Sequence, residues 1–330
     1  MSTVASSRVL FWRGLLLREL REHRALFLYL PLASLTLCLL LLWRLSSLAF
    51  DEGGQLRGAL QMLDGSDVLT FLPLLTAPHT LYLALMLLSA CLYTADCLAR
   101  ERRDQSFLFW QSMPVSDLQT VAAKASAALF LMPVCYSLAL LGVSLILVLV
   151  TVASIVLSAT EFAGFAELLQ VVLAANALAT LSALIAMLWI LPVIGWLALF
   201  SSLGTRWPLV FALAVLVLLG GLETTLLQSE TINLLVRSRV NPFEFLVFDF
   251  SEIGSRLFSY ELLAGAALGT GLLAGAVVLR RANDSGRAQR LIAIVSAAVA
   301  LVLIEGALSG RETTGLLLNN PFVELTLPIF

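Results

Sequence analysis

Few side chains in this sequence have the types and spacing that catalysis requires. The two histidines, His23 and His79, lie far apart, and no H-E-x-x-H, G-x-S-x-G or glycine-rich nucleotide-binding motif ending in Lys-Ser/Thr occurs. The only lysine is Lys124. Metal-dependent hydrolysis, serine hydrolysis and P-loop hydrolysis of nucleotides therefore have no visible apparatus. We expect no catalytic residues, no bound metal and no enzymatic activity in this chain.

A second set of polar side chains lies within long apolar segments and includes Arg44, Asn176 and Glu223. Polar groups inside a membrane span line a substrate path or pair with a neighbouring helix. Arg44 and Glu223 are close to segment ends, where an Arg44–Glu223 ion pair or contact with the membrane surface is the simpler interpretation. Asn176 is central enough for a helix–helix hydrogen bond. All three remain candidates for a substrate path.

The longest arginine-rich interruption between apolar segments is Leu98–Lys124, which we call the elbow. Its candidate docking residues are four charged side chains followed by three aromatic ones: Arg100, Glu101, Arg102, Asp104, Phe107, Phe109 and Trp110. After a break at Met113-Pro114, Ser116 and Gln119 are spaced as a capping box that begins a new helix. Aromatic and arginine side chains dominate the energy of protein interfaces, so the elbow predicts a docking site for a soluble partner.

Local helix stability is the alternative explanation of the elbow charges. An Arg100–Asp104 pair at i,i+4 would contribute about 0.3–0.5 kcal/mol to an exposed helix. Such a pair requires no partner protein.

Composition places the chain in a membrane. Hydrophobic residues make up 60% of the sequence and charged residues 13%, whereas a soluble domain has about a quarter charged residues. The net charge of −2 and the absence of long basic blocks argue against nucleic acid as a partner. The four cysteines have spacings that suit neither zinc nor disulfides, and we expect small buried side chains: Cys38, Cys91, Cys97 and Cys135. We expect no cleavable signal peptide.

We expect membrane spans where about 20 apolar residues can cross a hydrocarbon layer of roughly 30 Å. They lie at residues 26–48, 71–96, 125–157, 169–203, 208–228 and 261–279, with a shorter seventh at 291–308. The third and fourth exceed the required length, so they must tilt, kink at Pro133 and Pro192, or project from the bilayer. Projection of the third on the elbow side would lengthen the elbow.

Residues 1–25 have the pattern of an amphipathic helix that lies in the membrane interface. Val9, Trp12, Leu16 and Leu20 form one apolar stripe. The interfacial charges expected to face lipid head groups are Arg18, Arg21, Glu22 and Arg24. A short cytosolic helix packed on a partner is the alternative.

Basic residues alternate along the chain and predict its orientation. The segments 1–25, 97–124, 204–207 and 280–290 hold fourteen, whereas the alternate segments hold five. The positive-inside rule therefore places the N terminus and the elbow in the cytoplasm. The same count supports the seventh span and an exported C terminus.

The outer segment 229–260 is rich in phenylalanine and contains a helix-start pattern, Asn241-Pro242-Phe243-Glu244. We expect short helices that dip into the outer leaflet or fold back between spans; a membrane-surface cap is the alternative. In the sixth span, Gly265/Gly269 and Gly271/Gly275 have the small-xxx-small spacing of close helix packing.

Two charged stretches resemble permease subunits of bacterial type-2 ABC exporters. Residues 18–24, R-E-L-R-E-H-R, are similar to the R-E-x-x-E-H-R lead of that family. The stretch from Tyr93 to Asp117, which includes most of the elbow, resembles its Y/D…E-R-R-D-x-S-x-x-F-W-x-S-x-P-V-S-D stretch. The resemblance covers the six-span plan, with specific matches in these two places.

This resemblance implies an all-α integral membrane protein of the bacterial inner membrane, with a six-span permease core. The implied parts are an N-terminal interfacial helix at 1–25, a transmembrane domain at 26–280 with the coupling elbow at 98–124 and outer helices at 229–260, and a C-terminal extension at 288–330 with the extra span. That extension departs from the six-span family pattern.

The resemblance also implies partners. Two cytosolic P-loop ATPases would dock on the interfacial and coupling helices and bind the ATP and Mg²⁺, with no cofactor on this chain itself. A second permease copy or a paralogue would complete a dimer. Family substrates range over peptides, drugs, lipids and glycans, so the cargo is not implied. Two alternatives are a non-transporting anchor or regulatory subunit of an ATPase complex and, less favoured, an intramembrane enzyme.

Overall fold

The computed structural model describes residues 2–38, 40, 72–104, 115–157, 165–227, 231–241, 251–281 and 284–308, and within these ranges all regular structure is helical. The α-helices are α1 (Ser2–Glu22), α4 (Leu72–Arg103), α6 (Asp117–Ser126), α7 (Met132–Leu157), α8 (Phe165–Trp189), α9 (Leu191–Ser201), α10 (Pro208–Leu222), α11 (Thr231–Val240), α12 (Ser251–Leu257), α13 (Tyr260–Arg281) and α14 (Asp284–Leu308). The π-helical segments are η1 (Ala25–Tyr29), η3 (Ala127–Leu131) and η4 (Glu223–Leu227).

Five described helical segments are long and apolar enough to cross a membrane: His79–Arg103, Asp117–Ile146, Val172–Trp189, Pro208–Thr225 and Tyr260–Arg281. The chain is therefore a multi-pass, all-helical membrane protein. The five segments overlap, in order, the predicted second to sixth spans. Of the predicted first span, 26–48, the structure describes residues up to 38 and residue 40, and Ala25–Cys38 forms a shorter apolar helix.

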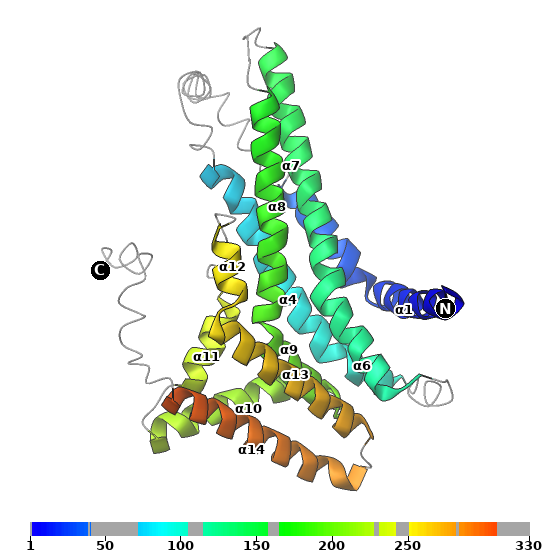
Figure 1. The fold of residues 1–330 in the computed structure, drawn as a ribbon, viewed down its shortest axis with the longest axis vertical. Coiled ribbons are helices and arrows are strands. Elements are labelled where there is room, and N and C mark those ends of the chain that lie inside the picture. The colour runs from blue at the N-terminus through cyan, green and yellow to red at the C-terminus, as the bar shows by residue number, and fades with distance from the viewer. Residues whose placement is uncertain are drawn as a thin grey trace.

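The long helices form a bundle whose two ends differ. Helices α4, α7 and α8 pack along one another, and α9 packs between α4 and α13. Figure 1 shows α7 and α8 rising side by side beyond the ends of the other described helices. This extra length lies away from the start of α6, so the third span projects at the end opposite to the elbow.

The prolines predicted to distort the long spans do so. Helix α8 ends at Trp189 and α9 begins at Leu191, with Pro192 in its first turn, so the predicted fourth span is two helices. The π-helical segment η3 ends two residues before Pro133, and η1 stands in the same relation to Pro31. Proline has no N–H for the carbonyl four residues back and its ring crowds that carbonyl, so a wider turn or a break relieves the clash.

Glycines set the closest helix packing, between α9 and α13. A Cβ atom built on Gly195 would lie 2.6 Å from the Gly269 carbonyl oxygen. One built on Gly275 would lie 3.2 Å from a Leu199 methyl group, whereas one on Gly271 would meet nothing within 4 Å. The small-xxx-small prediction thus holds within the chain for Gly269 and Gly275, and Gly271 faces open space.

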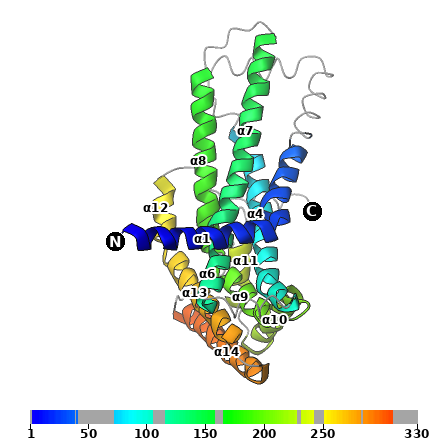
Figure 2. The same ribbon diagram turned by 90° about the vertical axis from the view of Figure 1, so that its right-hand side faces the viewer.

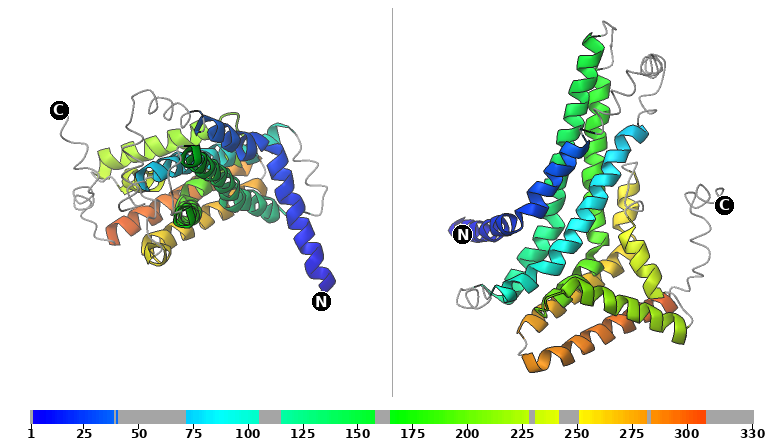
Figure 3. Two further views of the ribbon diagram at one scale, coloured as in Figure 1. Left: turned by 90° about the horizontal axis from the view of Figure 1, so that it is seen from above. Right: turned by 180° about the vertical axis from the view of Figure 1, so that it is seen from behind.

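Helix α1 runs across the direction of the long helices and extends outward from the bundle (Figures 2 and 3). Leu16 and Leu20 pack against the core, so this part of the apolar stripe faces protein. Glu19 and His23 are also buried. The bundle therefore covers the second half of the predicted apolar stripe.

Helix α14 carries the predicted seventh span. It packs on α13 and α11, and its apolar part, Gln289–Ala300, is shorter than the five spans. We expect reporter fusions placed after residue 285 and at residue 330 to report opposite sides of the membrane. If both fusions report the same side, α14 lies along the surface and the chain ends on the side of the elbow.

Candidate functional site: a buried ion cluster at the elbow

Four charged side chains from four different helices meet in the protein interior where both ends of the elbow return to the bundle. They are Glu19 of α1, Glu101 of α4, Lys124 of α6 and Arg280 of α13, each 2–5% exposed. We call these four residues the ion cluster. Ion pairs between these residues thus join helices that are far apart in the sequence.

Lys124 lies between the two buried glutamates. Its ammonium nitrogen is 3.0 Å from Glu19 Oε1 and 3.2 Å from Glu101 Oε1. The Tyr93 hydroxyl donates a hydrogen bond of 2.7 Å to Glu19 Oε2. One lysine therefore joins α1 to the end of α4.

Arg280 makes the second junction. Its Nη1 donates to Glu101 Oε2 at 2.8 Å and its Nε donates to Asp117 Oδ1 at 2.9 Å. Asp117 is the first residue of α6, so this one guanidinium joins α13 to both helices that flank the elbow. Arg18 adds a longer contact, 3.4 Å, from its Nη2 to Glu101 Oε1.

An aromatic layer borders the cluster. The Tyr93 ring meets His23 edge-on, with centroids 4.9 Å apart, and meets Phe27 in the same way at 5.2 Å. Burial, and next the charge of Lys124, lower the pKa of His23 below its usual value. The neutral imidazole is therefore favoured beside the cluster, which keeps its charges balanced.

Charge balance explains how the cluster tolerates burial. The carboxylates of Glu19, Glu101 and Asp117 face the cations Arg18, Lys124 and Arg280. Moving an ion out of water costs several kcal/mol, which only close and well-bonded counter-charges offset. The helices must therefore keep their relative positions to within hydrogen-bond distances.

Glu101 corrects the prediction for the elbow charges. It was expected as an exposed docking residue, but its side chain is 4% exposed and bonded within the chain. Helix α4 continues to Arg103, well past the predicted span end, and one more turn of helix directs Glu101 into the bundle. Arg102 is partly buried too and donates to the Arg280 carbonyl at 3.3 Å.

The other elbow charges are more accessible. Arg100 and Asp104 form an i,i+4 pair at 3.5 Å, with side chains 51% and 62% exposed. This geometry fits the alternative of a helix-stabilising pair and also leaves both groups accessible to a partner. Phe107, Phe109 and Trp110 lie outside the described residues.

The capping box that begins α6 is confirmed. The Ser116 hydroxyl accepts from the Gln119 backbone N–H at 3.2 Å, and the Gln119 side chain accepts from the Ser116 N–H at 2.9 Å. The elbow therefore re-enters the bundle at a defined point, next to Asp117 and its bond to Arg280.

The predicted interfacial residues divide into two groups. Arg18 bonds to Glu22 at 2.6 Å and also reaches Glu101, so it belongs to the border of the cluster. Arg21 and Arg24 are exposed, as an interfacial role requires. Sequence reasoning missed Glu19, Lys124 and Arg280; the single lysine of the chain was the one available signal.

The candidate substrate-path residues bond to neighbouring helices. Asn176 of α8 is buried and accepts from the Ser144 hydroxyl of α7 at 3.3 Å, which confirms a helix–helix hydrogen bond. Glu223 is buried and accepts from the backbone N–H groups of Thr231 and Ile232. Arg44 lies outside the described residues.

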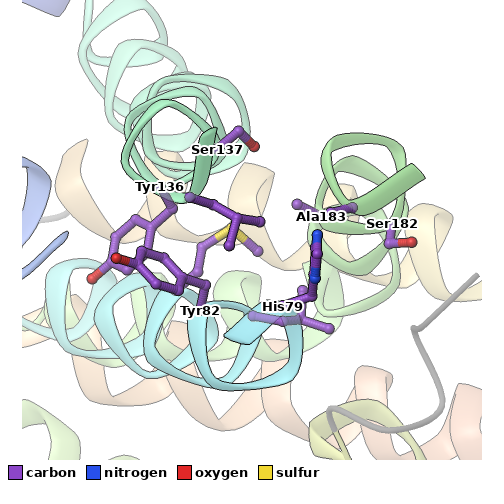
Figure 4. Close-up of a pocket in the computed structure, with 10 residues that line it drawn as sticks. His79, Tyr82, Tyr136, Ser137, Ser182 and Ala183 are labelled. Atoms are coloured by element: carbon purple, nitrogen blue, oxygen red, sulfur yellow. The ribbon is translucent and has the colours of Figure 1, made fainter. Parts of the chain in front are cut away.

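A separate hollow lies between α4, α7 and α8, nearer the start of α4. Figure 4 shows His79, Tyr82, Tyr136 and Ser182 among the side chains that line it. The space is about 330 Å³, part of it open to the outside. Its lining has aromatic, hydroxyl and imidazole groups and no carboxylate or guanidinium.

One group in the described part of the chain has the spacing of metal ligands, Glu19, Glu22 and His23, whose ligand atoms lie within 4.8 Å of one another. Both Glu19 oxygens already accept from Lys124, and Glu22 is bonded to Arg18. An adjacent ammonium and guanidinium repel a metal cation, so we assign these residues to the ion cluster and its border.

Comparisons of the chain with protein-family models, with curated proteins and with solved structures found no match in any of the three. Functional inference therefore depends on the residues and the fold themselves.

Proposed function

We propose that this chain is the permease subunit of an ATP-driven transporter of the ABC-exporter type. In this proposal separate ATPase subunits bind the nucleotide and dock on the elbow. The chain supplies the path through the membrane and carries no nucleotide site of its own. Export or extraction of the cargo takes place across the bacterial inner membrane, with the N terminus in the cytoplasm.

The ion cluster is the observation that carries the proposal. Through Glu101, Lys124, Arg280 and Glu19 it ties both ends of the elbow to α13 and to the interfacial helix. If the elbow moved while α1 and α13 stayed in place, the buried ion pairs that join them would be separated. A movement of the elbow caused by a bound ATPase would therefore also move the membrane helices. Coupling of ATP hydrolysis to transport requires such a connection.

The proposed docking surface is the exposed end of α4 with the elbow that follows it. Arg100 and Asp104 present accessible charges there, and Arg102 sits between them and the cluster. Phe107, Phe109 and Trp110 are the proposed apolar anchor. Glu101 acts in this proposal through the cluster and does not touch the ATPase.

Two copies of the permease, or one copy and a paralogue, complete the proposed transporter. ATP is sandwiched between two ATPases, and each ATPase needs an elbow. The mass of the detergent-solubilised complex tests this stoichiometry, since a complex with one permease chain contradicts it.

Purification followed by reconstitution separates the proposed function from its alternatives. A bound P-loop ATPase supports the permease and argues against an intramembrane enzyme. Substrate-stimulated ATP hydrolysis in liposomes argues against a non-transporting anchor or regulatory subunit. A chain that purifies without an ATPase, from cells that express the neighbouring genes, contradicts the proposal.

A charge swap tests the docking surface without changing the local helix pair. In Arg100→Glu/Asp104→Arg the i,i+4 pair persists, so folding should match the wild type, whereas the charges presented to a partner are inverted. We expect at least about tenfold weaker ATPase binding, equivalent to about 1.4 kcal/mol. Binding is measured by titration of the solubilised permease with the purified ATPase.

Arg237→Glu is the matched control for this swap, because Arg237 is an exposed arginine on α11, away from the elbow. It should leave ATPase binding unchanged. If the swap variant binds and transports like the wild type, the Arg100–Asp104 pair only stabilises its helix.

A further inference from the structure

Helix α11 is a ten-residue helix held at both ends by buried charged side chains. At its start, Glu223 accepts hydrogen bonds from the backbone N–H groups of Thr231 at 2.7 Å and Ile232 at 2.8 Å. A carboxylate at a helix N terminus satisfies free donors and interacts favourably with the helix dipole. The end of α10 therefore fixes where α11 begins.

At the other end, Arg239 is inserted between α8 and α13. Its guanidinium donates to the carbonyls of Trp189 at 3.3 Å and Glu261 at 2.7 Å, and lies 4.3 Å from the centre of the Trp189 ring. The Trp189 indole N–H donates in return to the Ser238 carbonyl at 3.1 Å. The Arg239 side chain is 5% exposed.

Gly265 makes this insertion possible. A Cβ atom at that position would lie 2.6 Å from Arg239 Nη1 and 2.7 Å from the guanidinium carbon. The planar guanidinium thus lies against bare backbone of α13 on one side and is stacked on an indole ring. The site fits the Arg239 side chain closely, and a residue larger than glycine at position 265 would collide with it.

The site coincides with the break between α8 and α9. Pro192 has no N–H to donate to the Leu188 carbonyl. Ile190 has ψ 0, and the Val193 N–H bonds to the Ile190 carbonyl at 2.9 Å. Arg239 supplies a donor to the Trp189 carbonyl at this point. A side chain from a different helix thus joins the last carbonyl of α8 to the Glu261 carbonyl of α13, beside the break.

The break between α8 and α9 is a candidate hinge, and Arg239 ties the end of α8 to α13 beside it. On one side of it lies α8, whose far end projects with α7 beyond the other helices (Figure 1). On the other side lies α9, which is fixed against α13 by the Gly195–Gly269 contact. Bending at Ile190 would therefore move the projecting α7–α8 hairpin against a stationary α9–α13 pair.

We propose that α11 acts as a strap, a short helix that holds two others together. Its Arg239 side chain keeps the angle between α8 and α9 at the value seen in the structure, by joining the end of α8 to α13. Withdrawal of Arg239 from between Trp189 and Gly265 removes the bond between the end of α8 and α13 and frees the α7–α8 hairpin to change its angle. A charged group buried in the protein interior is costly to retain, which favours a role beyond packing. The inference does not depend on the proposed transport function.

Hydrogen exchange on the full chain in lipid nanodiscs tests the strap. In Arg239→Met we expect at least tenfold faster amide exchange in α11 and around residues 189–194. Exchange in α4 and α6 near the ion cluster should be unchanged. Arg237→Met on the exposed face of the same helix is the matched control and should match the wild type throughout.

A second variant helps to distinguish a local effect on the hinge from a general loss of stability. Gly265→Ala keeps the arginine and places a methyl group where the guanidinium lies. We expect the same local acceleration as in Arg239→Met. Unchanged exchange around residues 189–194 in both variants overturns the proposal, as does an equal acceleration across all helices, which would make Arg239 a general packing residue.

Discussion

Replacement of Lys124 by methionine is expected to destabilise the folded chain by about 3–5 kcal/mol, the range observed when one partner of a buried ion pair is removed. Methionine preserves the length and apolar stem of lysine. Tyr93, Arg18 and Arg280 would then remain beside two buried negative charges, without the ammonium that lies between them. We expect α1 to lose its attachment to the bundle first, because Lys124 is its cationic link to α6.

Thermal unfolding in detergent measures this effect. A loss of 3–5 kcal/mol corresponds to a fall in Tm of roughly 4–7 °C for a chain of this size. The control is Arg100→Gln/Asp104→Asn, which removes an exposed pair on the neighbouring α4 and should change stability by no more than about 0.5 kcal/mol.

The double variant Lys124→Met/Glu19→Gln separates charge from packing. Glutamine keeps an acceptor for the Tyr93 hydroxyl and removes the charge that Lys124 would leave unpaired. The two changes should therefore cost less together than the sum of the single changes. Additive losses would show that Lys124 and Glu19 stabilise the chain independently, and the ion cluster would not be a single unit.

Periodicity and proline chemistry predicted the helices well. The apolar runs that became the five spans were visible because each is nearly uninterrupted, and Pro192 marked the break in the fourth. The capping box at Ser116 was visible because it depends on two residues three positions apart. Such features are local, and local patterns are what a single sequence records.

The ion cluster was not predicted because its bonds join residues far apart in the chain. Glu101 stands within a run of charges, and nothing in that run shows which turn of the helix faces the bundle. Its partner Arg280 lies 179 positions away. Helix α4 also continues beyond its apolar segment, so the rule that charged residues end a span placed Glu101 in solvent.

Arg239 was missed for a related reason. It was counted among the basic residues of an outer loop, and the start of a short helix was expected at Asn241-Pro242. The structure describes α11 before that point, ending at Val240, and residues 242–250 lie outside its description. Only the fold shows that Gly265 leaves room for a guanidinium.

Gly269→Ala should be the most damaging methyl addition in the sixth span. The new Cβ atom would lie 2.6 Å from the Leu191 carbonyl carbon and 2.7 Å from its oxygen. These are backbone atoms, so no side-chain rotation relieves the clash and α13 must move away from α9. Overpacking costs about 1–3 kcal/mol where the core can adjust, and the rigid contact here favours the upper end.

Gly271→Ala is the matched control, because it lies on the same helix and its Cβ would meet nothing within 4 Å. Alanine is the better helix former by about 0.8–1 kcal/mol, so this variant should be neutral or slightly more stable. Gly269→Ala should therefore lower the Tm measured in detergent, whereas Gly271→Ala should raise it or leave it unchanged. Equal shifts would show that the α9–α13 contact is looser than the backbone distances imply.

The consequence of Gly269→Ala should extend to the elbow. Helix α13 carries Arg280 near its last residue, and the bonds of Arg280 to Glu101 and Asp117 are 2.8 and 2.9 Å long. A helix displaced at Gly269 cannot keep both bonds at these lengths unless it bends. We therefore expect Gly269→Ala and Arg280→Met to be less than additive in the double variant, since each already disrupts the position of α13. Full additivity would show that α13 bends between Gly269 and Arg280, and that packing at the centre of the membrane and charge pairing at the elbow are independent.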